Sequence, residues 1–360
     1  MKNICFISGD ISRSGGTERV GLLIANYLVS RGYDVSILSI WRGEKTFFFC
    51  NPQIKKYTLI QNWLEKKLHR FKFISILKYH YFIKKNKFDF IIDIDTILAN
   101  LSTYAIRGTK CKLISWEHFN YLETIKDSQR IKALKKIERH SCQLVVLTRK
   151  DLNLHLTKTK LKKDRITQIY NPISFTPSRK IDINKKRVIT LGNFIPDKGY
   201  DLLLKIWSIV EKNISTDWYL EIVGSGKEEK KLKDLKEDLK LTRVIFSPKT
   251  QNVEHKYLQS SIYVLSSRNE GFPMVLLEAC AMGLPIIAFN CNTGPDEIIE
   301  DGLNGFLIEP FDITLFAQKL IELITNKSLR EKFSKKSIEI AQKFQIDKIG
   351  NEWESLLNHL

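Results

Sequence analysis

Short apolar runs alternate with helix-like segments through the first half of the chain. The runs are rich in β-branched residues, which predicts buried strands at 3–8, 35–40, 90–94, 112–115 and 144–147. Apolar positions recur at helical spacing over 17–30 and 131–141. Because strands alternating with helices are typical of a parallel sheet, the first half is predicted to be Rossmann-like.

The alternation stops near Tyr170-Asn171-Pro172, and a linker rich in Pro, Ser and charge follows. It resumes with predicted strands at 188–191, 219–223, 244–246, 262–265 and 284–289, and with helices at 200–210, 228–241 and 274–282. A chain of 360 residues can form two cores. We therefore predict domains at 1–172 and 173–343, and a final helix in 344–360 with Ile349, Trp353, Leu356 and Leu357 at helical spacing.

Two carboxylates interrupt the apolar stretch that runs from 262 to 289. Glu270 follows a predicted strand, and Glu278 lies eight residues later in a helix that is apolar nearly all round. A carboxylate in such a helix is costly to desolvate without a partner, so a buried ion pair with Lys or Arg is one interpretation of Glu278. The other is a ligand site, because Pro273 begins a helix whose N-terminus, at a strand's carboxyl end, favours phosphate.

These residues carry a resemblance to a known family. The sequence Ser-Arg-Asn-Glu-Gly-Phe-Pro-Met-Val-Leu-Leu-Glu-Ala, with Glu270-x7-Glu278, resembles the signature of retaining glycosyltransferases of family 4, which have the GT-B fold. The block Cys291-Asn292-Thr293-Gly294-Pro295, with Glu297 and Gly302-x-Asn304-Gly305, is similar to a branch that moves hexoses or N-acetylhexosamines from UDP-sugars in capsule, O-antigen or glycan assembly. The resemblance implies an α/β protein with two Rossmann-like domains facing across a cleft. The first would bind acceptor, the second nucleotide sugar, and the last helix would cross back to the first domain.

The resemblance also implies roles for individual residues. Glu270 would bind sugar hydroxyls or steady a positive anomeric centre, and His118, directly after the strand at 112–115, would lie near the transferred sugar. A lone His is otherwise most often structural. Gly15 and Glu18 would lie on the acceptor side, beside the reacting groups. The implied donor-binding residues are Gly16, Gly192, Asn193, Lys198, Arg268, Gly271, Phe272, Pro273, Met274, Val275 and Glu278.

One position departs from the family pattern. Lys198-Gly199 matches a pair whose Lys holds the donor diphosphate, but Asn193 stands where an Arg is expected. Arg268 or a neighbouring Lys would then supply the missing contact. A solvated loop base is the alternative interpretation of Lys198.

Several observations limit the cofactors. The loop at 9–16 is not G-x-G-x-x-G, so it gives little support to a nicotinamide or flavin site, and spacing alone equally allows a tight turn. The six Cys are scattered without a C-x-x-C pair, which argues against zinc and fits a reducing cytoplasm. The resemblance implies no metal and no cofactor beyond the nucleotide-sugar donor.

The net charge of +18 indicates a polyanionic partner. Residues 61–87 interleave eight bases with aromatics, a pattern that suits either a helix on an anionic membrane or a core-facing helix with a solvated basic side. Nucleic-acid binding is a third interpretation, but no recognised motif supports it, so no nucleic-acid partner is predicted. No run is long enough to span a bilayer. We expect a cytoplasmic protein, peripheral on the inner face of the plasma membrane, acting on a glycan acceptor carried by an undecaprenyl-type diphosphate lipid.

Two other functions remain open from the sequence. A nucleotide-sugar epimerase of the GT-B type would use the same donor site without an acceptor. A non-catalytic binding protein would use the positive charge alone.

Overall fold

The computed structural model describes residues 2–42, 45–60, 72–140, 142–215 and 217–360. These form two compact units, one of Met1–Ser174 with Ile346–Leu360, the other of Phe175–Gln345. The predicted boundaries differ from these by two residues at each point. Residues 61–71, the first part of the basic and aromatic stretch, lie outside the described residues.

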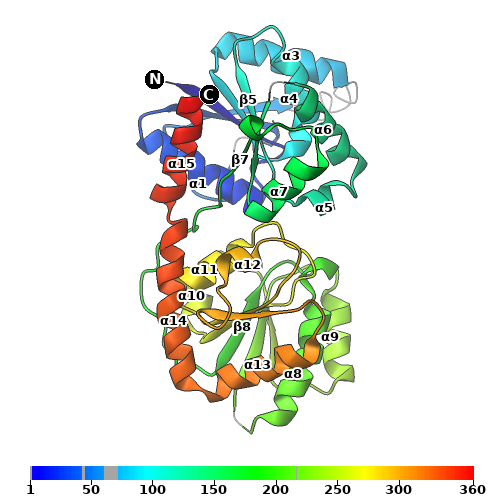
Figure 1. Cartoon of the computed structure of the whole chain (residues 1–360), viewed down its shortest axis with the longest axis vertical. Helices are drawn as coiled ribbons and strands as arrows, with labels where there is room; N and C mark the ends of the chain where they lie inside the picture. Colours follow the sequence, from blue (N-terminus) through cyan, green and yellow to red (C-terminus); the bar gives the residue numbers. More distant parts are fainter. Residues whose placement is uncertain (1, 43–44, 61–71, 141, 216) are drawn as a thin grey trace. The chain divides into compact units, whose positions relative to one another are not determined.

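The first unit contains a seven-stranded parallel sheet in the order β3-β2-β1-β4-β5-β6-β7 (Figure 1). The strands are β1 Asn3–Ser8, β2 Asp34–Trp41, β3 Lys55–Ile60, β4 Phe90–Asp93, β5 Lys112–Trp116, β6 Cys142–Val146 and β7 Ile166–Gln168. The apolar pattern predicts the five central strands but misses both edge strands. β3 begins with two lysines and β7 has three residues, so neither has a continuous apolar run.

Helices cover both faces of this sheet. They are α1 Gly16–Ser30, α3 Lys72–Asn86, α4 Ala99–Ala105, α5 Tyr121–Thr124, α6 Ser128–Arg139, α7 Arg149–Lys158 and α15 Ile346–His359. Side chains of α3, α4, α6 and α7 share one core with alternate residues of the strands. Asp127 caps α6 by accepting hydrogen bonds from the backbone N–H groups of Gln129 and Arg130, so this helix begins three residues before its predicted start at 131.

The C-terminal helix belongs to the first unit, as the GT-B resemblance implies. α15 packs beside α1 (Figure 1). Trp353 is fully buried, with its ring centroid 4.6 Å from that of Trp116. The Tyr27 hydroxyl donates to Asn351 Oδ1 at 2.8 Å, and a Cβ at Gly350 would collide with the Tyr27 ring. The prediction that the last helix crosses back to the first domain is confirmed.

The second unit has a six-stranded parallel sheet in the order β10-β9-β8-β11-β12-β13. Its strands are β8 Arg187–Leu191, β9 Tyr219–Val223, β10 Val244–Ser247, β11 Ile262–Leu265, β12 Ile286–Phe289 and β13 Gly305–Ile308. Its helices are α8 Tyr200–Asn213, α9 Glu229–Asp238, α10 Val253–Leu258, α11 Met274–Met282, α12 Pro295–Ile298, α13 Ile313–Thr325 and α14 Lys327–Ala341. The bounds of β9, β11 and α11 are those predicted, whereas α9 ends three residues before 241. Among the described residues, no helix is both long and apolar enough to cross a membrane.

Candidate active site

Both sheets reverse their strand order next to the loops that carry the predicted site residues. In the second unit the chain runs outward from β8 to β10 and then restarts at β11, which pairs with β8. In the first unit it restarts at β4, which pairs with β1. Ligands of open α/β sheets bind at such a switch point, outside the carboxyl ends of the strands. Lys198 and Glu270 follow β8 and β11, and Glu18 and His118 follow β1 and β5.

Lys198 and Glu270 form the centre of the site in the second unit. Lys198 Nζ donates to Glu270 Oε1 at 2.7 Å, and Ser267 Oγ donates to the same oxygen at 2.6 Å. Thr293 Oγ1 donates to the Glu270 carbonyl oxygen at 2.7 Å. The side chains of Lys198 and Glu270 are 24% and 9% exposed, so Lys198 is a positioned base rather than a fully solvated one.

Gly199 allows close packing between the loop that carries Lys198 and the loop that carries Glu270. It has φ +62°, and a Cβ there would collide with the Ser266 carbonyl oxygen. Ser266 Oγ in turn donates to the Lys198 carbonyl oxygen at 2.9 Å. The Lys-Gly pair therefore follows from geometry, because only glycine allows the backbone approach that aims Lys198 at Glu270.

The start of α11 lies next to this pair in the chain. Pro273 is the N-cap, directly before the first helical residue Met274, and its side chain makes no capping hydrogen bond. A Cβ at Gly294 would crowd Pro273 and the Gly271 carbonyl oxygen, so the loop with Thr293 packs on the helix start. Phe272 is buried against Phe344, with ring centroids 5.7 Å apart. Donor binding by Gly271, Phe272, Pro273, Met274 and Val275 stays a prediction, in which Met274 and Val275 would contribute first-turn N–H groups.

Glu278 is 2% exposed on the following turns of α11. Its Oε2 accepts a hydrogen bond of 2.9 Å from the Tyr257 hydroxyl, which α10 supplies. This neutral donor contributes to satisfying the buried carboxylate that the sequence singles out.

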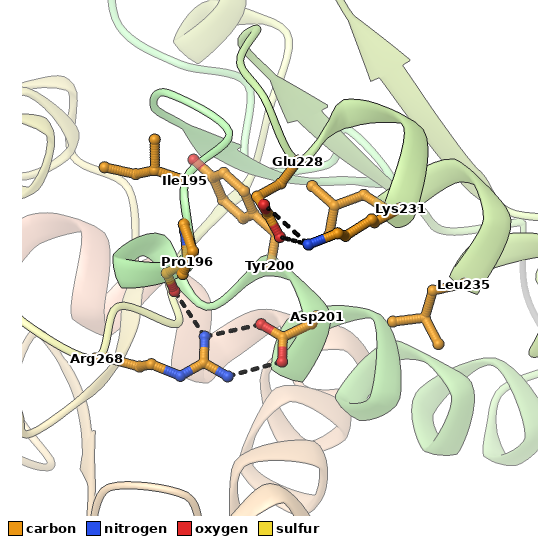
Figure 2. A pocket seen from close by; sticks show the side chains of 9 residues that line it. Ile195, Pro196, Tyr200, Asp201, Glu228, Lys231, Leu235 and Arg268 are labelled. Atoms are coloured by element: carbon orange, nitrogen blue, oxygen red, sulfur yellow. Dashed lines mark hydrogen bonds and ion pairs between the residues drawn. The ribbon is translucent and has the colours of Figure 1, made fainter.

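Asn193 stands where the family pattern has an Arg, and Arg268 is one of its predicted replacements. The Arg268 guanidinium donates to both Asp201 carboxylate oxygens, at 2.8 and 2.7 Å, and to the Pro196 carbonyl oxygen at 2.7 Å (Figure 2). Asn193 is exposed, and a Cβ at Gly192 would crowd the Tyr200 hydroxyl. That Arg268 replaces the expected Arg stays a prediction, and its guanidinium pairs with the Asp201 carboxylate in this structure.

The first unit places its predicted residues after β1 and β5, the two strands that flank β4. Gly15 is the N-cap of α1 and Gly16 its first residue, and a Cβ at Gly15 would collide with the Glu18 carboxylate. Burial raises the pKa of Glu18. Asp95, directly beyond β4, acts electrostatically on both Glu18 and His118. The loops after β1, β4 and β5 thus share one electrostatic environment.

His118 is held as a neutral base. Its ring centroid lies 4.6 Å from that of Trp116, and in the described part of the chain its buried Nε2 has no hydrogen-bond partner. Burial lowers the pKa of His118 to about 4. A neutral imidazole with a free ring nitrogen can donate or accept one hydrogen bond from a sugar or acceptor hydroxyl.

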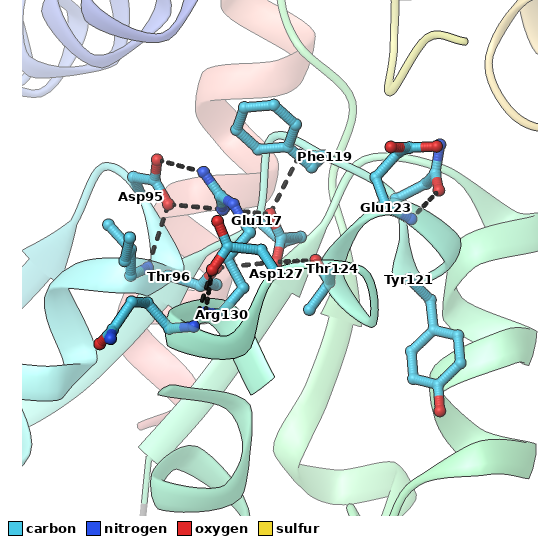
Figure 3. Close-up of polar contacts among 12 residues, drawn as sticks. Asp95, Thr96, Glu117, Phe119, Tyr121, Glu123, Thr124, Asp127 and Arg130 are labelled. Atoms are coloured by element: carbon cyan, nitrogen blue, oxygen red, sulfur yellow. Dashed lines mark hydrogen bonds and ion pairs between the residues drawn. The ribbon is translucent and has the colours of Figure 1, made fainter. Parts of the chain in front are cut away.

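A buried network that sequence reasoning missed fixes the loop carrying His118 (Figure 3). Glu117 Oε2 accepts from Thr96 Oγ1 at 2.7 Å and Thr124 Oγ1 at 3.1 Å, and its Oε1 accepts from the Phe119 N–H at 3.0 Å. Arg130 donates to both Asp95 oxygens at 2.9 Å, and its Nη1 lies 3.5 Å from Glu117 Oε1. Burial raises the pKa of Glu117 to about 7. Glu117 directly follows an apolar strand, so the reasoning used for Glu278 could have found it. Nothing in the sequence links Arg130 to it.

We expect His118 to stay neutral down to about pH 4, the value to which burial lowers its pKa. Its ordinary value is 6.5, so between pH 6.5 and 4 the unfolded chain binds a proton that the folded chain does not. The contribution of His118 to stability is therefore complete above pH 6.5 and is lost as the pH falls toward 4. Histidine NMR with a His118→Gln variant for assignment measures this directly. A midpoint near 6.5 would contradict the burial argument.

Comparison with known proteins identifies the family. The sequence model described as Glycosyl transferases group 1 matches residues 175–340, and the one described as Glycosyltransferase Family 4 matches residues 14–176. An uncharacterized glycosyltransferase of Haemophilus influenzae is 36% identical over 360 residues, covering 99% of this chain and 100% of its own. The chain belongs to glycosyltransferase family 4. This family 4 glycosyltransferase is therefore an enzyme, and the family membership predicted from the Glu270-x7-Glu278 block is confirmed.

Other relatives of this family 4 glycosyltransferase have named activities. The amylovoran biosynthesis glycosyltransferase AmsD of Erwinia amylovora is 30% identical, with 99% of this chain and 100% of AmsD covered. A Campylobacter jejuni enzyme that is 26% identical, with 99% and 98% covered, is named an α-1,4-N-acetyl-D-galactosaminyltransferase acting on a glycan linked to undecaprenol diphosphate. Relatives of this glycosyltransferase thus act in bacterial polysaccharide and lipid-linked glycan assembly.

Solved structures give the fold of the family 4 glycosyltransferase. TarM has a TM-score of 0.84 at 16% identity, with 99% of each chain covered. Anabaena HepE in complex with UDP-glucose has a TM-score of 0.80 at 18% identity, with 100% of each chain covered. At this identity the likeness shows the fold alone, and that fold is GT-B, as the sequence predicts.

Proposed function

We propose that this family 4 enzyme is a retaining transferase that moves a hexose or N-acetylhexosamine from a UDP-sugar to a glycan acceptor in bacterial surface polysaccharide assembly. The observation that carries the proposal is the Lys198–Glu270 pair, at 2.7 Å, at the switch point of the second sheet. The helix α11, whose N-cap Pro273 makes no side-chain capping hydrogen bond, begins four residues after Glu270. A cation and a helix N-terminus together favour a diphosphate, the leaving group of a nucleotide sugar.

The proposed reaction depends on charge and position. The bond from the anomeric carbon to the diphosphate breaks, negative charge grows on the leaving diphosphate, and the acceptor oxygen forms the new bond while its proton passes to the leaving diphosphate. Lys198 and the first turn of α11 would stabilise the diphosphate. Glu278 would accept hydrogen bonds from ribose hydroxyls, Glu270 would contact the sugar, and neutral His118 would bind a sugar or acceptor hydroxyl.

We further propose that the reaction needs no resident metal, because Lys198 and the helix N-terminus supply the positive field that a metal would otherwise provide. Activity should then persist in EDTA. Loss of activity in EDTA, with recovery on adding Mg²⁺ or Mn²⁺, would overturn this part of the proposal.

The donor is tested by calorimetry with UDP, GDP and dTDP and with their sugar conjugates. UDP should bind in preference, and its sugar conjugate should be consumed faster when a glycan acceptor is added. Conversion of a UDP-sugar to its epimer without acceptor would instead show an epimerase. No binding of any nucleotide would favour a non-catalytic protein.

The acceptor and location are proposed from α3 in the first unit. One side of α3 packs in the core through Tyr79 and Ile83. The opposite side exposes Phe73, Leu77 and Tyr81, which are 69%, 50% and 67% exposed and stand one helical turn apart. Exposed Lys84 and Lys85 follow. Aromatic side chains beside lysines, in a chain of charge +18, suit the anionic face of a membrane. We therefore propose a peripheral enzyme at the inner leaflet, with an acceptor on an undecaprenyl-type diphosphate lipid.

Changing Phe73, Leu77 and Tyr81 together to Ser should weaken sedimentation with anionic vesicles at least about tenfold, because each buried apolar side chain contributes about 1.5–3 kcal/mol. The matched control changes three other exposed apolar residues, Ile125, Ile245 and Leu303, to Ser. Equal loss in the control variant, or equal binding to neutral vesicles, would overturn the membrane proposal.

A further inference from the structure

A basic groove is lined by residues of α6 and of the segment around α4. These two helices pack side by side (Figure 1). It has a volume of about 390 Å³, within the range of ligand sites. One wall is the α6 stripe of Lys132, Lys135, Lys136 and Arg139, whose spacing places them on one face of the helix. The other wall includes Tyr104 and Arg107, and no Asp or Glu is among the described residues that line the groove.

The groove is preorganised around the Tyr104 ring. The Arg107 guanidinium lies 4.6 Å from the ring centroid, and Lys136 Nζ lies 4.7 Å from it. Lys136 Nζ also donates to the carbonyl oxygen and to Oδ1 of Asn100, each at 3.0 Å. Two of the cations are thus held by the protein in the absence of a ligand, which lowers the entropy cost of binding an anion.

The bases of the groove lie close to one another. In the described ranges no ion pair is made by Lys132, Lys135 or Arg139. The effect is visible at His140, whose pKa is lowered by burial and then by Arg107, Lys136, Arg139 and Arg165. Bases on a convex surface are usually solvated and need no partner. Five Lys and Arg side chains around a concave site leave a positive potential that an anion would neutralise.

The groove is separate from the residues assigned to the reaction. It lies between two helices of the layer that covers one face of the first sheet, whereas Glu18 and His118 follow strand ends and Lys198 belongs to the other unit. Donor binding therefore does not account for the groove. Its bases contribute to the net charge of +18, which the donor site alone does not explain.

We propose that the α4–α6 groove is a second anion site that binds phosphate groups, most favourably two linked ones. The α6 bases recur at each helical turn, about 5.4 Å apart along the helix, and so match a run of phosphates rather than a single carboxylate. Guanidinium and ammonium groups are the usual partners of phosphate oxygens. The phosphate source is either a lipid headgroup or a soluble phosphorylated ligand. The site is independent of the transferase proposal.

The test titrates the full-length protein with inorganic diphosphate and follows the imidazole of His140 by NMR. A bound anion stabilises the imidazolium, so the pKa of His140 should rise. The groove variant combines Lys132→Gln, Lys135→Gln and Arg139→Gln, and should weaken diphosphate binding at least tenfold. The matched control combines Lys205→Gln, Lys230→Gln and Lys335→Gln, which removes the same charge from exposed positions of the other unit. Lys198→Ala should leave the His140 response intact, which separates the groove from the donor site.

A second experiment distinguishes a lipid headgroup from a soluble phosphorylated ligand as the source of the phosphate groups. Vesicles with phosphatidylglycerol should abolish the diphosphate response if the groove binds headgroups, and phosphatidylcholine vesicles should not. If neither vesicle competes, the site takes a soluble phosphorylated ligand. The proposal is overturned if His140 does not respond to diphosphate or vesicles, if the groove and control variants lose equal affinity, or if duplex RNA binds the groove more tightly than diphosphate.

Discussion

We expect the Lys198→Ala variant to lose about 100- to 1,000-fold in kcat, the usual effect of removing one group that stabilises charge in a transition state. Lys198 Nζ is fixed 2.7 Å from Glu270, by a glycine that no other residue can replace without a collision. Its charge would act on the leaving diphosphate, whose charge grows as the bond to the sugar breaks. The loss should therefore appear mainly in kcat, with a smaller change in KM.

The same change should also destabilise the second unit, because the Glu270 carboxylate is 9% exposed. Losing a charged hydrogen-bond partner there costs about 1–3 kcal/mol. The measurement pairs steady-state kinetics with thermal unfolding, and Lys205→Ala on the exposed face of α8 is the control. Activity within a few-fold of the unchanged enzyme, in a folded variant, would remove Lys198 from the mechanism.

Replacing Glu278 by Ala should weaken UDP binding by about 10- to 100-fold, because hydrogen bonds to a charged group contribute about 1.5–3 kcal/mol. The carboxylate is buried in α11, and Oε2 accepts from the Tyr257 hydroxyl. This bond orients the carboxylate, so Tyr257→Phe serves as a matched variant that keeps the charge and removes one donor. It should weaken UDP binding less than Glu278→Ala does.

Calorimetry of UDP and of inorganic diphosphate separates the ribose contribution from the diphosphate contribution to binding. Diphosphate affinity at the donor site should change little in the Glu278 variant, since the ribose contact is absent from that ligand. Equal UDP affinity in the folded Glu278→Ala variant would show that the carboxylate serves the structure alone.

The central strands and the donor loops could be predicted because their signals are local. β11 is a continuous apolar run, and α11 lies between the N-cap Pro273 and the C-cap Gly283. Each of these features depends on neighbouring residues, so a single sequence contains it. Glu270 and Lys198 lie 72 positions apart, and only the family resemblance placed them in one site.

The missed features depend on pairing between distant segments. Arg130 reaches Asp95 across 35 positions and so fixes the loop of His118. Arg268 pairs with Asp201 across 67 positions, a contact that competes with the donor role assigned from sequence. From the sequence, the α6 bases are indistinguishable from an ordinary solvated helix face. Only the structure shows that they line a groove together with Tyr104 and Arg107. Hydrophobic periodicity gives no information on such contacts, because it does not specify which polar groups meet.

The most direct test of the account is the anomeric configuration of sugar released when water replaces the acceptor. The purified enzyme is incubated with UDP-glucose, UDP-galactose and their N-acetylhexosamine counterparts, and proton NMR records the first anomer formed from the α-linked donor. A retaining transferase releases the α-anomer first, and Glu270→Gln should abolish this hydrolysis while the variant stays folded. Initial release of the β-anomer, or hydrolysis unaffected by Glu270→Gln, would contradict the proposed site and mechanism.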